Sequence, residues 1–142
     1  MNGVLTRMTL RVIASMALSC LASFVGCQSL RYRLNEQNAQ ASVKSIRSSE
    51  KIFVSNNQNG EYATLQELVA KDLIDPKLAS GTKDGYRFDL SVKGKSYKVM
   101  AVPISYNETG SWSFYVDETG IVRGTSLNRP ANNNDPPVRY QD

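Results

Sequence analysis

Residues 28–59 contain neither proline nor glycine, the two residues that most often interrupt helices. Four apolar residues in this stretch are spaced by four, three and seven positions, which places them on one stripe of a helix. They are Ala39, Val43, Ile46 and Phe53. The pattern predicts one amphipathic helix over about residues 30–55, ended by the polar cluster at 56–60. The apolar stripe of such a helix must be buried against another layer of the fold.

Two short helical turns are expected after the long helix. Thr64 and Glu67 fit a capping box, in which each side chain bonds the backbone N–H of the other residue, so a helix is predicted over about 65–71. Asp75-Pro76 offers a second helix cap followed by a first-turn proline. Gly81 would end that second turn.

The hydrophobic period then changes to two, as in half-buried strands. The first alternating residues are Tyr86, Phe88, Leu90 and Val92. A turn at Lys93-Gly94 leads to a second strand that runs to Pro103, and a third strand begins at Trp112. The tight turn at 117–120 returns the chain as a fourth strand over 121–123.

The order of these elements predicts an α+β fold: a long N-terminal amphipathic helix packed on a small antiparallel sheet of three to four strands. Such a small sheet must bury one face, and the stripe of the long helix is the available partner. Residues 125–142 are rich in proline and asparagine and poor in apolar residues, which predicts a disordered tail.

The chain begins with a segment typical of a signal peptide. Arg7 and Arg11 precede the uncharged run 12–25, which is shorter than the roughly 20 residues that a membrane-spanning helix needs. Gly26 is small, as a cleavage site requires, so residues 1–26 are expected to be removed.

The order apolar, apolar, small, cysteine at residues 24–27 resembles a bacterial lipoprotein signal, although Phe24 stands where that pattern prefers leucine. The resemblance implies cleavage between Gly26 and Cys27, and acyl chains such as palmitate on Cys27. Cys20 fits less well, because it would shorten the apolar run. The alternative is that Cys27 ends an uncleaved anchor or an ordinary signal peptide.

Three runs of the chain, in order, resemble the head domain of type IV pilins and of the pseudopilins of type II secretion. They are ASVKSIRSSEKIFVSNNQNGEYATLQELVAKDLID at 41–75, LASGTKDGYRFDL at 78–90 and AVPISYNETGSWSFYVDETGIVRG at 101–124. The resemblance implies a pilin-like α+β domain over residues 27–124.

The start of the mature chain departs from the pilin pattern. A pilin has glutamate at the fifth mature position and then a long apolar stretch, whereas the fifth residue counted from Cys27 is Arg31, within the polar run CQSLRYRLNEQNAQ. Charged residues in a buried filament core would be costly. Polymerisation by the pilin route is therefore not expected.

The residue types exclude several kinds of chemistry. The chain has no histidine, and its only cysteines lie in or beside the leader, so Cys/His catalytic pairs and common zinc sites are not expected. Some pseudopilin heads bind calcium at their C-terminal sheet, and by that resemblance Asp117 and Glu118 could be ligands. The simpler interpretation is an aspartate-initiated turn closed by Gly120. No cofactor or resident metal is predicted.

Two surface features remain. Trp112 could form a binding surface with Tyr86, Tyr97 and Tyr115, although its place in an alternating strand favours the core. A cationic group is expected on a solvated sheet face, where it could also touch anionic lipid headgroups. It comprises Lys83, Arg87, Lys93, Lys95 and Lys98. The net charge of +4 falls to +2 without the leader, which gives little reason to expect a nucleic-acid partner.

The sequence thus predicts a non-enzymatic bacterial lipoprotein of the cell envelope, anchored in the inner or outer membrane through Cys27 and facing the periplasm or the exterior. Its head would act as an interaction module, with pilus or type II secretion components as candidate partners. One alternative is a minor pilin or pseudopilin that keeps residues 12–26 as a helical anchor. Another is a small ligand-binding or hydrolytic lipoprotein, which would need a concave site with convergent polar groups.

Overall fold

The structure is a computed structural model that describes residues 30–139. The signal peptide predicted over 1–26, the lipidation site at Cys27 and the last three residues of the predicted tail lie outside the described residues. The chain divides into two units after Arg31, and the contacts described below belong to the second unit, which begins at Tyr32.

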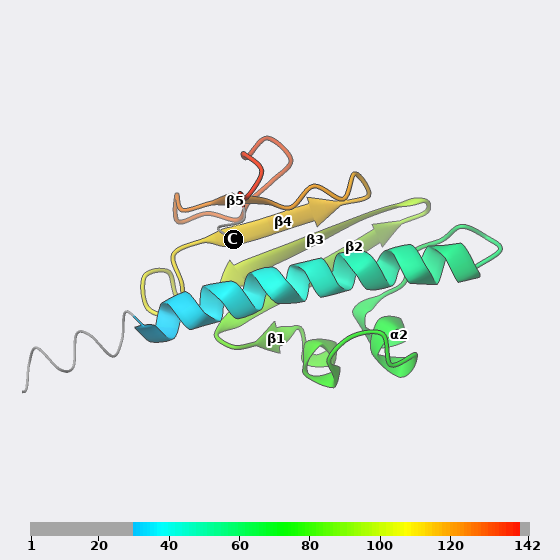
Figure 1. Ribbon diagram of the computed structural model, residues 1–142, viewed down its shortest axis with the longest axis horizontal. Helices are drawn as coiled ribbons and strands as arrows, with labels where there is room; N and C mark the ends of the chain where they lie inside the picture. Colours follow the sequence, from blue (N-terminus) through cyan, green and yellow to red (C-terminus); the bar gives the residue numbers. More distant parts are fainter. Residues whose placement is uncertain (1–29, 140–142) are drawn as a thin grey trace, which may run out of the picture. The chain divides into compact units, whose positions relative to one another are not determined.

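One long helix spans residues 30–56, which confirms the prediction of a helix over 30–55. Figure 1 shows this helix, coloured blue to green, lying along one face of the sheet. Three residues of the predicted stripe, Ala39, Val43 and Ile46, are at most 1% exposed, and Phe53 is half-buried at the edge of the same core. The apolar stripe of the helix is therefore covered within this domain.

Five strands form one antiparallel sheet in the order β1-β2-β3-β4-β5. They are β1 (Thr82–Lys83), β2 (Tyr86–Lys93), β3 (Ser96–Pro103), β4 (Ser113–Asp117) and β5 (Arg123–Thr125). The α+β class is as predicted, but the prediction of three to four strands was wrong by one. The additional strand, β1, has only two residues, which is too short to produce an alternating pattern in the sequence.

The register places apolar side chains in rows across the sheet. Phe88 of β2 pairs with Ala101 of β3, which pairs with Phe114 of β4. All three are buried in the core beneath the helix. Alternate residues on β2, such as Arg87 and Asp89, are exposed on the opposite face. The period of two in the sequence thus reflects one face packed on the helix and one partly open to solvent.

The segment between the long helix and the sheet contains both predicted helical turns. Helix α2 (Leu65–Ala70) carries the complete capping box of Thr64 and Glu67. The 3-10 helix η1 (Pro76–Ser80) is capped by Asp75, whose side chain accepts a hydrogen bond from the backbone of Lys77. Gly81 ends η1 with a φ of 73°, a conformation that favours glycine.

The C-terminal segment differs from the disordered tail predicted over 125–142. Its residues 126–139 follow a defined path beside β4 and β5. The hydroxyl of Ser113 donates to the carbonyl oxygen of Arg129 at 2.6 Å. The backbone N–H of Val138 donates to the carbonyl oxygen of Val122 at 2.9 Å. Ala131 is only 1% exposed.

Polar contacts explain why this segment packs despite its composition. The guanidinium of Arg129 donates to both carboxylate oxygens of Asp135, and the backbone N–H of Asn132 donates to the same carboxylate. The hydrogen bonds from Arg129 lower the pKa of Asp135. Bidentate pairs of this kind are geometrically specific, and composition alone does not reveal them.

Candidate functional site

The turn after β4 contains Asp117 and Glu118, the two residues considered as calcium ligands. The carboxylate of Asp117 accepts hydrogen bonds from the backbone and hydroxyl of Thr119 on one oxygen, and from the hydroxyl of Tyr115 on the other. Burial acts to raise the pKa of Asp117, but these hydrogen bonds outweigh it and lower the pKa. The carboxylate is thus held in its charged form by the turn itself.

Among the described residues, Asp117 and Glu118 are not part of a larger cluster of acidic side chains. Glu118 is exposed, and within residues 30–139 no three histidine, cysteine, aspartate or glutamate side chains gather closely enough to hold a metal ion. The guanidinium of Arg47 on the long helix donates to the carbonyl oxygen of Gly120 at 2.9 Å. These contacts give the turn a structural role: it joins β4 to β5 and ties both to the helix.

The aromatic residues considered as one binding surface are separated by the fold. Tyr86, Tyr97 and Tyr115 are at most 9% exposed, whereas Trp112 is 39% exposed. The interpretation of Trp112 as a core residue was wrong, because β4 begins one residue later and Trp112 lies outside the strand. Its carbonyl oxygen nevertheless accepts a hydrogen bond of 2.7 Å from the buried hydroxyl of Tyr86.

The predicted cationic group is mainly solvated. Its members Arg87, Lys93, Lys95 and Lys98 are exposed. Lys83 instead forms an ion pair with the cap residue Asp75, with 3.0 Å between Nζ and Oδ2. The group is therefore divided between one structural ion pair and a set of exposed charges.

The first turns of the long helix are fastened to the segment that precedes β4. One carboxylate oxygen of Glu36 accepts hydrogen bonds from the backbone N–H and hydroxyl of Ser111, both at 2.7 Å, and from the backbone N–H of Trp112 at 3.2 Å. The side-chain amide of Asn35 donates to the carbonyl oxygen of Thr109 at 2.9 Å. Sequence reasoning missed this role of Glu36, although its position three residues before Ala39 and seven before Val43 places it in line with the apolar stripe.

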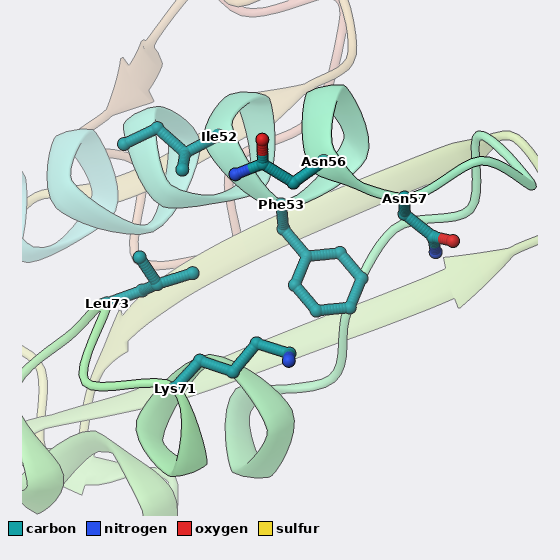
Figure 2. A pocket seen from close by; sticks show the side chains of 6 residues that line it. All are labelled: Ile52, Phe53, Asn56, Asn57, Lys71 and Leu73. Carbon is teal, nitrogen blue, oxygen red and sulfur yellow. The ribbon is translucent and has the colours of Figure 1, made fainter.

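A hollow of about 640 Å³ lies where the long helix ends against α2, and Figure 2 shows its lining. The lining residues are Ile52, Phe53, Asn56, Asn57, Lys71 and Leu73. The ring of Phe53 projects from the helix toward Lys71, whose amine lies 6.0 Å from the ring centroid. Apolar groups, amides and one amine can contact a ligand or a partner, but they contain no pair suited to acid–base catalysis.

Further hollows flank the long helix, and two of them are larger than the first. One of about 680 Å³ adjoins the turn after β4 and includes Arg47, Tyr62 and Glu118. The other, of about 710 Å³, lies between the helix and the C-terminal segment, with Trp112 and Arg139 in its lining. Both of these hollows are open to solvent and are lined by polar and apolar residues.

An unusual ionisable group is Glu50, which points from the long helix into the core and is fully buried. Its Oε2 accepts a hydrogen bond of 3.0 Å from the backbone N–H of Ala63, and its Oε1 has no hydrogen-bond partner among the described residues. Burial raises its pKa to about 7. The available signal was position: Glu50 follows Ile46 by four residues and therefore lies on the apolar stripe.

Within the part of the chain that the structure describes, no helix is long and apolar enough to cross a membrane. Comparison of the chain with protein-family models, with curated proteins and with solved structures found no match. The functional interpretation therefore depends on the residues themselves and on the resemblances visible in the sequence.

Proposed function

We propose that this chain is a bacterial lipoprotein whose pilin-like head is held at the surface of an envelope membrane by acyl chains on Cys27. The head acts there as a non-enzymatic interaction module, with components of a pilus or a type II secretion system as its candidate partners. The observation that carries the proposal is the uncharged run 12–25 that ends in Gly26-Cys27, directly before the polar start of a long helix.

The packing of the long helix supports an anchored head rather than a filament subunit. Its apolar stripe, from Ala39 to Ile46, is already covered by the sheet of the same domain. The first described turns of the helix contain Arg31 and Arg33 and are not an apolar stretch. A filament core built from such helices would bury charged residues without partners, which is costly.

A minor pilin or pseudopilin remains the second candidate. The observation that favours it is the combination of one long N-terminal helix with an antiparallel sheet, in the order that the pilin resemblance implies. This candidate requires residues 12–26 to stay on the mature chain as its anchor.

Lipid attachment is tested by metabolic labelling with a palmitate analogue in a bacterial host, followed by membrane fractionation. The native chain should carry the label and sediment with membranes, and Cys27→Ala should lose the label. Cys20→Ala is the matched control, because it removes the other cysteine and should leave labelling unchanged. Loss of the label in the Cys20 variant alone, or its retention in the Cys27 variant, contradicts the proposal.

A further inference from the structure

Several strands begin or finish at the same end of the sheet, near the first described turns of the long helix. Thr125 at the end of β5 pairs with Ser113 at the start of β4, and Phe114 pairs with Ala101, two residues before the end of β3. Figure 1 shows the end of β3 and the start of β4 on the side where the long helix begins. Residues just beyond these strand ends therefore lie at the same end of the domain.

Three of those residues are large, apolar and exposed. Ile104 follows β3 and is 60% exposed, Trp112 precedes β4 and is 39% exposed, and Leu127 follows β5 and is 71% exposed. Leu127 lies in a loop whose two ends both contact Ser113, through the pairing of Thr125 and the hydrogen bond to the carbonyl oxygen of Arg129.

The long helix adds a fourth exposed apolar residue to this end. Leu34 is 57% exposed and comes directly before Asn35 and Glu36, whose side chains bond the segment that contains Trp112. We call Leu34, Ile104, Trp112 and Leu127 the apolar end. The strand pairing and the hydrogen bonds place all four residues near one end of the domain, where exposed large apolar side chains can contact a partner or a membrane.

Chain length indicates what the apolar end contacts. Cys27 precedes Leu34 by seven residues, so even a fully extended chain keeps the two within about 25 Å. An acylated Cys27 would therefore hold this end of the domain close to the bilayer. Ionisable residues of both signs, such as Arg33 and Glu108, are exposed near the apolar end, so the charge there is mixed.

We propose that the apolar end inserts its side chains into the interfacial layer of the lipid bilayer that holds the anchor. The inference rests on the lipid attachment proposed above, and it adds a defined orientation of the head on the membrane. Tryptophan suits this layer because its ring is apolar and its indole N–H is polar. Apolar contact adds to the membrane affinity of the acyl chains.

Trp112 is the only tryptophan of the chain, so its fluorescence reports on this end directly. The membrane-extracted protein is reconstituted into phosphatidylcholine vesicles, with and without bromine on the lipid chains. Brominated chains should quench Trp112, its emission should shift to shorter wavelength than in water, and acrylamide should quench it poorly. High salt should leave these results unchanged.

The first control moves the tryptophan to the opposite end of the domain. A chain with Trp112→Phe and Ile121→Trp has its single tryptophan at an exposed residue in the turn before β5, and this tryptophan should be quenched by acrylamide and not by bromine. The second control is matched to a variant that alters the apolar end itself. Ile104→Ser with Leu127→Ser should reduce bromine quenching of Trp112. The pair Ile52→Ser and Ile121→Ser, which alters two exposed isoleucines away from the apolar end, should not.

The outcomes separate the two proposals. An acylated protein whose Trp112 stays open to acrylamide and unaffected by bromine overturns this inference but leaves the lipid anchor in place. Absence of acyl mass on the extracted protein contradicts the anchor itself. Protection of Trp112 that is lost on dilution, without bromine quenching, would assign the apolar end to a second copy of the chain and would also overturn the inference.

Discussion

Replacement of Glu50 by glutamine should remove a specific pH dependence of stability. The pKa of this buried carboxyl is about 7 in the folded chain, against 4.5 for an ordinary glutamate, and burial is the main cause. Below about pH 4.5 the group is protonated in both states, and its effect on folding is then most favourable. As the pH rises from about 4.5 to about 7, the unfolded chain releases this proton while the folded chain still holds it, so stability is lost progressively.

The magnitude follows from the difference between the two pKa values. A difference of about 2.5 pKa units corresponds to at most about 3 kcal/mol of unfolding free energy, lost between about pH 4.5 and pH 8. Glu50→Gln carries no charge at any pH and should not show this loss. Its amide oxygen can still accept the hydrogen bond from the backbone of Ala63.

The assay is urea unfolding of the native chain and of Glu50→Gln, followed by circular dichroism at about pH 5 and about pH 8. From about pH 5 to about pH 8 the native chain should lose unfolding free energy that the variant keeps, so the variant should be more stable relative to the native chain at the higher pH than at the lower. Glu61→Gln makes the same chemical change at an exposed position and should show no such gain. An equal difference between native chain and Glu50→Gln at both pH values would refute the assignment of a raised pKa to Glu50.

Substitutions at two other positions test the packing around the segment before β4, and thermal unfolding measures each variant. Gly110→Ala would place a methyl group against the hydroxyl of Tyr86, so stability should fall by about 1–3 kcal/mol through overpacking; an unchanged unfolding temperature would contradict this contact. Glu36→Ala removes the acceptor for the backbone N–H groups of Ser111 and Trp112 and should cost about 1–3 kcal/mol. Glu36→Gln, which keeps an acceptor oxygen, should lose less, and an equal loss in both variants would argue against the hydrogen bonds.

The elements predicted correctly are those with strong local signals. The long helix follows from its apolar stripe and from the absence of proline and glycine, and the capping box of Thr64 and Glu67 follows from residue types at a fixed spacing. The turn at Asp75-Pro76 has the same kind of local cause. These features depend on neighbours within one or two helical turns, so a single sequence contains them.

The features that sequence reasoning missed depend on contacts between distant residues. The pairing of Arg129 with Asp135, and the hydrogen bond from Ser113 to the same segment, hold a stretch whose composition is typical of disorder. Glu36 and Trp112 are joined across 76 positions of the chain. Neither contact produces a periodic pattern, and Trp112 was placed in the core only because the start of β4 was set one residue too early.

The most direct test of the central claim is the intact mass of the protein extracted from membranes of a bacterial host. A lipid-anchored head predicts a chain that begins at Cys27 and carries added acyl mass, and a Cys27→Ala variant without that mass. A mature chain that retains residues 12–26 and carries no lipid would contradict the account, because the apolar run would then be the anchor itself.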